Sequence, residues 1–272
     1  MFEDVEFPEE QGYQSDTTFP FIQWVNGQKA FARLHPVLGT GGWAMQETNV
    51  LGELGWDRGD LPHKNGDTTP CYFAQTLNFA LIAEKFRWFL TNAQTGQTEY
   101  LEKYQPGARG KYQVLVAVKE AGDLQGEPWM LTVKGMTAKY LYDAFKMYRS
   151  KLLPFAATLS KKRLPLYAFW CAISAGAPIT VGTAPNTSVI TPPAMIVPEM
   201  SNKEAVTGFL VEQFVGQDNI TRFSMWWTLA QDWAKDKPKT ETAEAPAEQS
   251  DETAWHMQEP PPDFDAEAEI PF

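Results

Sequence analysis

The chain has 272 residues, a formal net charge of −11 and 43% hydrophobic residues, enough to bury one large core or two small ones. Residues 1–6 are acidic and carry no apolar run, so we expect no secretory signal, and the apolar stretches are too short to predict a membrane span. Cys71 and Cys171 lack a Cys-x-x-Cys spacing, which favours a reducing compartment and predicts no metal site.

The acidic residues are concentrated at the two ends. Residues 1–16 hold six acids and residues 240–272 hold ten, and neither segment contains Lys or Arg. The residues between them carry 18 acids and 23 bases, a net charge of +5. A basic body between acidic ends is typical of a nucleic-acid binder with an acidic interaction tail. An acidic tail that aids solubility is the alternative, and charge alone favours neither.

Composition divides the chain into three segments. We expect residues 1–16 to be an acidic flexible N-terminus and residues 17–236 to be a folded core. From residue 237 onward the chain consists largely of Pro, Thr, Ala, Glu and Gln, which cannot bury enough apolar area to offset the entropy of ordering. Residues 237–272 are therefore predicted to be a disordered acidic tail, whose tip is residues 263–272.

Strand signals dominate the first half of the core. Residues 85–90 and 97–104 flank residues 92–96, which end in glycine, and the pattern predicts a hairpin. β-branched residues bounded by turn signals predict further strands over residues 112–118 and 129–133.

The second half of the core mixes helices with short strands. A helix is predicted to start at Thr137, a good N-cap residue, and strands follow over residues 166–173 and 179–181. Two further helices are predicted, one capped by Ser201 and one after Asp218. The fold expected from these elements is α+β and β-rich, an OB-fold-like barrel with added helices. The OB-fold is the natural candidate because its strand face binds single strands by stacking.

The last ten residues carry the most specific motif, because an acidic segment with Asp-Phe-Asp is followed by a terminal Ile-Pro-Phe. The motif resembles the C-terminal tip of bacterial single-stranded DNA-binding proteins, although residues 266–269 replace a shorter, all-acidic spacer. The matching residues are Asp263, Phe264, Asp265, Ile270, Pro271 and Phe272. The core itself shows no resemblance to that family.

The resemblance implies a protein that coats single-stranded DNA and recruits replication, recombination and repair proteins through its tip. Phe272 would place its ring in a pocket and its carboxylate against a basic rim, while Pro271 restricts the backbone. The acids also resemble DNA electrostatically, so the tail can fold back on the basic core. We expect no cofactor and no membrane partner. The expected location is the cytoplasm, at the nucleoid, or a host cytoplasm if a phage encodes the chain. The oligomeric state is left open, a homo-oligomer included.

Binding of single strands requires cations for phosphates and aromatic faces for bases. Alternation along the first hairpin strand predicts one face toward DNA, with Phe86, Trp88 and Leu90 in the core. An ordinary half-buried strand with solvated cations is the alternative. The residues expected to contact DNA on this face are Lys85, Arg87 and Phe89, and the return strand and the following glycine-rich loop extend the patch with Lys103, Tyr104, Arg109 and Lys111.

Two other features are candidate contacts. The glycine-rich residues 39–42 lack the Lys-Ser/Thr ending of a phosphate loop, so we do not expect them to bind a nucleotide. They either present Trp43 to a base or form a turn in which Trp43 is buried, and we favour the turn. Lys161, Lys162 and Arg163 form a basic cluster that either holds phosphate or ends a helix.

No pattern predicts an enzyme. The three histidines, His35, His63 and His256, stand apart, and the acids at 57, 60 and 67 match no strong metal-ligand spacing and are typical of a surface loop. Two alternative functions remain. One is an accessory protein that uses the tip to imitate a host single-strand binder, and the other is a metal-dependent nuclease.

Overall fold

The structure, a computed structural model, describes residues 19–46, 51–52, 56–63, 67–91, 98–183 and 186–235. Both predicted end segments, 1–16 and 237–272, lie outside these residues. The described residues form an α+β, strand-rich arrangement, which confirms the predicted fold class. The described strands do not close into a barrel, so the predicted OB-fold is not confirmed.

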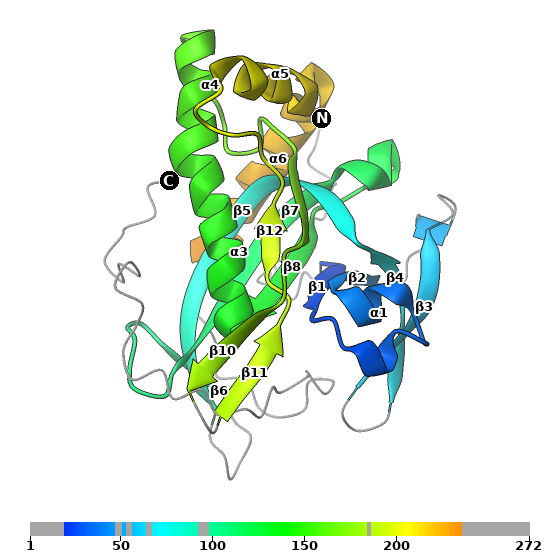
Figure 1. Ribbon diagram of the computed structural model, residues 1–272. Helices are drawn as coiled ribbons and strands as arrows, with labels where there is room; N and C mark the ends of the chain where they lie inside the picture. The colour runs from blue at the N-terminus through cyan, green and yellow to red at the C-terminus, as the bar shows by residue number, and fades with distance from the viewer. Residues whose placement is uncertain are drawn as a thin grey trace, which may run out of the picture.

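Most of the strands belong to a single mixed sheet (Figure 1). Its order is β12-β9-β5-β7-β8-β1-β2-β4-β3, and β6 pairs with β5 beside this path. Among the described strands of this sheet, β1 and β8 are the parallel neighbours. The strands are β1 (Phe21–Val25), β2 (Gly42–Gln46), β3 (Asp57–Pro62), β4 (Thr68–Ala74), β5 (Thr76–Thr91), β6 (Thr98–Leu101), β7 (Arg109–Val118), β8 (Trp129–Lys134), β9 (Cys171–Ala175) and β12 (Pro193–Met195). The separate hairpin is β10 (Ile179–Thr183) with β11 (Asn186–Ile190).

The long strand β5 organises the sheet. It pairs with β7 over most of its length, with β9 near its start and with β6 near its end. A register shift between Leu81 and Ala83 moves one residue out of step with β7. Side chains therefore exchange faces at this bulge. Phe79 and Leu81 belong to the main hydrophobic cluster, whereas Ala83 belongs to the cluster on the other face.

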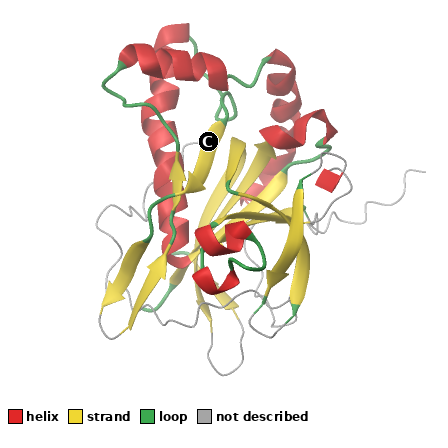
Figure 2. Ribbon diagram, turned by 45° about the vertical axis from the view of Figure 1, so that its right-hand side comes forward, coloured by secondary structure: helices red, strands yellow, loops and turns green. Residues whose placement is uncertain are grey.

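Helices cover both faces of the sheet (Figure 2). In Figure 1, α3 crosses in front of the sheet and α6 lies behind it. The main cluster includes Leu141 and Phe145 of α3, and the second cluster includes Phe223 and Trp226 of α6. The helices are η1 (Lys29–Phe31), α1 (Pro36–Thr40), η2 (Lys119–Leu124), α3 (Gly135–Met147), η3 (Tyr148–Leu152), α4 (Leu153–Ser160), α5 (Lys203–Gln213) and α6 (Gln217–Lys235). None of the helices described is both long and apolar enough to span a lipid bilayer.

The segments α3, η3 and α4 follow one another without a break, and η3 is a π-helical turn. Pro154 is the second residue of α4, two residues after the end of this turn. Proline has no N–H group and its ring clashes with the preceding helical turn, so a locally wider π turn accommodates it.

Three element boundaries differ from the sequence prediction. Helix α3 starts at Gly135, whose φ of +61° suits glycine, and Thr137 is a buried residue inside the helix rather than its cap. The cap of α5 is Asn202, whose side chain accepts from the Ala205 N–H at 3.0 Å, rather than Ser201. The strand predicted over residues 166–173 is shorter and later, because residues 166–168 form a turn and β9 starts at 171.

Candidate nucleic-acid interface

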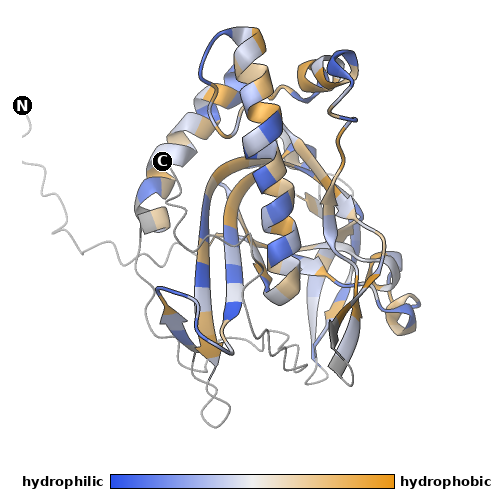
Figure 3. Ribbon diagram, turned by 60° about the vertical axis from the view of Figure 1, so that its left-hand side comes forward, coloured by the Kyte–Doolittle hydropathy of each residue, from blue (hydrophilic) through white to orange (hydrophobic). Residues whose placement is uncertain are grey.

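Helix α6 covers only part of its sheet face. Its buried residues share a cluster with Ala83 and Leu115, and its last turn reaches Lys85. The Lys85 Nζ donates to the Trp233 carbonyl at 3.3 Å and lies 3.9 Å from the Trp233 ring centroid. Figure 3 shows hydrophilic residues in the later part of β5 and the early part of β7, with hydrophobic residues again at the end of β5. The face beyond Lys85 therefore carries both cations and aromatic residues.

Three cations lie directly opposite one another on this part of the face. The strand register pairs Arg87 of β5 with Lys111 of β7, and Lys111 with Lys134 of β8. Directly paired residues share a sheet face, so these three side chains form a line across three strands, which we call the basic row. Like charges placed directly opposite one another destabilise a sheet. The row therefore costs stability unless other groups compensate for its charge.

Two aromatic rings lie among these cations. Phe89 of β5 is paired in register with Tyr100 of β6. The Tyr100 ring centroid lies 6.0 Å from the Arg87 Cζ and 5.3 Å from the Lys111 Nζ. The Lys111 Nζ also donates to the Tyr100 Oη at 2.7 Å, and the Lys134 Nζ lies 5.6 Å from the Phe89 ring centroid. Such cation–π contacts offset part of the repulsion within the basic row.

A buried polar cluster supports the opposite face of the same strands. The Tyr112 hydroxyl and the Arg149 guanidinium both donate to the Glu84 carboxylate. Burial, followed by the charge of Glu84, raises the pKa of the Tyr112 phenol well above its ordinary value, so this group stays a donor. Burial lowers the pKa of Arg149, but Glu84, followed by Tyr112, raises it by more. The charge of Glu84 is thus compensated on the face away from the basic row.

Aromatic rings continue along that opposite face. Trp88 packs against Phe86 and against Tyr104, with ring centroids 5.0 Å apart in both pairs. Phe86, Trp88 and Leu90 are all half-buried, and Phe86 packs against the main core, as the sequence predicts. A Cβ placed on Gly110 would lie 2.5 Å from a Phe86 ring atom, so glycine is required beside this ring.

The hairpin side chains that the sequence predicts to contact DNA are less exposed to solvent than the alternation along the strand suggests. Phe89 is 4% exposed and Lys111 is 7% exposed, which contradicts a base stacked on Phe89 and limits phosphate contact by Lys111. Arg87 and Lys85 are half-buried. Arg109 and Lys111 lie on β7 rather than in a loop. The reason is tertiary, because the Tyr100 ring of the neighbouring strand β6 and the Lys134 side chain pack around Phe89 on the face that alternation leaves outside.

Lys103 and Tyr104 lie just beyond β6 rather than on it. Lys103 is exposed, while Tyr104 is half-buried against Trp88. These two residues flank the hairpin strands, and Tyr104 belongs to the aromatic face opposite the basic row.

Trp43 is not available to a base. It lies on β2 rather than in a turn, it is fully buried, and its Nε1 donates to the Ile173 carbonyl at 3.0 Å. The glycines before it have a packing role, because a Cβ on Gly42 would lie 2.6 Å from the Ala74 carbonyl oxygen. The sequence interpretation of Trp43 as buried is confirmed, and its place in a turn is wrong.

The second basic cluster lies elsewhere. Lys161, Lys162 and Arg163 are exposed at the end of α4, where Lys161 adopts a left-handed φ of +53°. Figure 1 shows α4 and β6 at opposite ends of the molecule. The structure therefore does not bring this cluster together with the basic row.

Sequence reasoning missed two members of the site, Lys134 and Tyr100. A signal for Lys134 was present, because it continues the alternation of Met130 and Thr132 on the strand that was predicted to end at residue 133. The register that pairs Tyr100 with Phe89 depends on the hairpin connection and is not fixed by composition.

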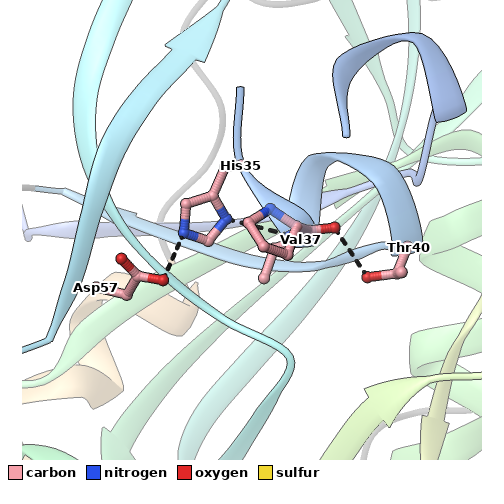
Figure 4. A network of polar contacts seen from close by, with 5 residues as sticks. His35, Val37, Thr40 and Asp57 are labelled. Carbon is pink, nitrogen blue, oxygen red and sulfur yellow. Dashed lines mark hydrogen bonds and ion pairs between the residues drawn. The ribbon is translucent and has the colours of Figure 1, made fainter. Parts of the chain in front are cut away.

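The acidic segment near residue 57 has a structural role. Asp57 begins the edge strand β3 rather than a loop, and its Oδ2 lies 2.9 Å from the His35 Nε2 (Figure 4). The His35 Nδ1 accepts from the Val37 N–H at 3.1 Å and caps α1, so the Nε2 carries the proton toward Asp57. Among the residues that the structure describes, no three His, Cys, Asp or Glu side chains gather as a metal site.

The C-terminal tip, residues 263–272, lies outside the described residues. Comparison of the chain with protein-family models, with curated proteins and with solved structures found no match. The functional interpretation therefore depends on the chain's own residues.

Proposed function

We propose that this protein binds single-stranded DNA without sequence preference through the basic row and its flanking residues. The observation that carries the proposal is the register of Arg87, Lys111 and Lys134. Three cations in line across neighbouring strands concentrate positive charge on one face of the sheet. A chain of phosphates that runs across them would release its counterions, which favours binding.

The cations and the aromatic rings would contact different parts of the DNA. Arg87 and Lys134 are half-buried and would contact phosphates, with Lys111 held behind them by Tyr100. Tyr100 is the half-buried ring among these cations, and a base stacked on such a ring contributes about 1–3 kcal/mol. Stacking and phosphate contacts are both tolerant of sequence, which suits a protein that coats DNA.

The OB-fold remains part of the proposal. What supports it is the pairing path β5-β7-β8-β1-β2-β4, because β4 and β5 are separated in the chain by Gln75 alone. If β4 and β5 are counted as one bent strand, this path has five strand positions. These five would enclose the main core, as in a partly open barrel. In this arrangement the basic row lies on the outer face of the strands.

The tip would supply the second half of the function. It lies at the end of an acidic segment that begins shortly after α6. Phe272 with acids before it fits a partner with an apolar pocket and a basic rim. We therefore propose that the tip recruits replication, recombination or repair proteins to the coated strand.

The first prediction tests the basic row by removing two of its charges. An Arg87→Gln, Lys134→Gln double variant should bind oligo-dT more weakly than the wild type by fluorescence titration. The slope of log affinity against log salt should fall by about 0.7 for each phosphate that the variant no longer neutralises. The weakening should be similar for oligo-dA and oligo-dT.

A Lys161→Gln, Lys162→Gln variant is the matched control, because it removes the same charge from the exposed end of α4. It should keep most of the wild-type affinity. Equal weakening in the two variants would show that net charge rather than the basic row governs binding. A wild-type affinity that does not change with salt would refute electrostatic binding altogether.

A further inference from the structure

Two edge strands of the main sheet, β3 and β12, are protected against pairing with other chains. The edge strand β3 carries Asp57, Arg58 and Asp60. The opposite edge strand, β12, is three residues long and begins at Pro193. Charges, proline and short length are the devices by which natural proteins block edge-to-edge association.

The β10–β11 hairpin lacks this protection. Its strands read Ile-Thr-Val-Gly-Thr and Asn-Thr-Ser-Val-Ile, with no charge and no proline. It stands apart from the main sheet, below β12 in Figure 1. In the described part of the chain, no residue outside the hairpin forms a strand pair with either of its outer edges.

The two faces of the hairpin differ. Val181 and Ile190 are buried and lie on the face toward the body. Thr180 and Val189, which pair in register on the other face, are exposed, and Val189 is 66% exposed. The end of β11 is held to the body, because the Trp24 Nε1 donates to the Thr191 carbonyl at 2.8 Å. The hairpin is therefore an anchored arm with an uncharged outer face.

Charge indicates what the arm can bind. Residues 164–198 contain no Asp, Glu, Lys or Arg, although the whole chain has a net charge of −11. That net charge comes from the two acidic end segments, whereas the residues between them carry a net charge of +5, so like segments of two copies repel each other and an uncharged arm avoids that repulsion. A nucleic acid requires cations, which the arm does not offer. Antiparallel pairing of a strand with its own copy is self-complementary, as a two-fold interface requires.

We propose that the β10–β11 hairpin is the contact through which two copies of this chain associate, by antiparallel pairing of equivalent hairpin edges. Thr and Val side chains on the outer face suit cross-strand pairing. The association is separate from DNA binding, because the hairpin contains none of the residues of the basic row.

The test measures the oligomeric state of the full chain. Sedimentation of the wild type over about a hundredfold range of micromolar concentration should show a monomer–dimer equilibrium. Val189→Lys should disturb the β11 edge and Thr180→Lys the β10 edge. At least one of them should raise the dimer dissociation constant about tenfold, because each copy then brings a positive charge into an uncharged contact.

Val211→Lys is the matched control, because Val211 is 76% exposed on α5 and receives the same change of charge. It should leave the equilibrium unchanged, and thermal unfolding should show that all three variants stay folded. A wild type that is monomeric throughout, or a dimer that neither hairpin lysine weakens, would overturn the proposal. The Arg87→Gln, Lys134→Gln variant should dimerise normally even though it loses DNA affinity.

Discussion

At the scale of single residues, the most constrained side chain near the candidate site is Glu84. It lies one residue before Lys85 on β5, yet it points to the opposite face, where Tyr112 and Arg149 donate to it. A buried carboxylate with two donors is well compensated, but removal of one member leaves the others unsatisfied. The strand that carries the basic row therefore depends on a polar contact on its other face.

Glu84→Gln should strongly destabilise the protein. The change removes the negative charge that compensates Arg149, and breaking a buried ion pair costs about 3–5 kcal/mol. Urea unfolding at neutral pH measures the effect. Asp143→Asn is the control, because its pair with Lys139 is partly exposed on the surface of α3 and should contribute less than about 1 kcal/mol. Similar destabilisation in the two variants would mean that the Glu84 cluster is not the anchor described above.

Gly110 is a second residue on which the hairpin depends. Gly110→Ala should destabilise the protein by about 1–3 kcal/mol, because the added methyl group meets the Phe86 ring. Gly208→Ala, on α5 where a Cβ meets nothing within 4 Å, should instead be neutral or stabilise by about 0.5–1 kcal/mol. Thermal unfolding of both variants measures the two changes in stability. A stable Gly110→Ala protein would require that Phe86 moves freely.

At the scale of elements, the sequence predicts most strands and helices but not how they cover one another. Alternation over residues 85–90 correctly separates Phe86 from Arg87, because the bulge near Leu81 lies before this segment. Nothing in the local pattern indicates that Trp233, far along the chain, lies beside Lys85, or that Tyr100 of β6 packs beside Phe89. These contacts depend on tertiary packing, which periodicity does not encode.

The candidate site, too, is only partly predictable from the sequence. The sequence identifies Lys85, Arg87 and Lys111 as neighbours of the site, because cations and aromatics are interleaved on two predicted strands. It misplaces Trp43, because a run of glycines is typical of a turn, whereas here it permits close contact between β2 and β4. The basic row itself requires the cross-strand register, which only the folded sheet provides.

At the scale of the whole molecule, the acidic tail and the basic row are connected through α6. The last turn of α6 packs on Lys85, two residues before Arg87, so the chain leaves the described core beside the row. The ten acids of residues 240–272 follow α6 in the chain, and we expect them to reach the cations that we propose for DNA. A tether raises the effective concentration of the tail at this site well above that of a separate peptide.

Deletion of residues 240–272 should therefore raise the affinity for oligo-dT. The acids compete with phosphate for the same cations, so their removal leaves the basic row available to DNA. The gain should shrink as salt is added, because charges that attract across solvent are screened over about 10 Å at 0.1 M and about 3 Å at 1 M. A full-length variant with every tail acid changed to its amide is the control, and it should bind as tightly as the truncated chain, since charge rather than length is responsible. If the truncated protein instead binds DNA more weakly, the tail belongs to the binding surface and does not compete with DNA for it.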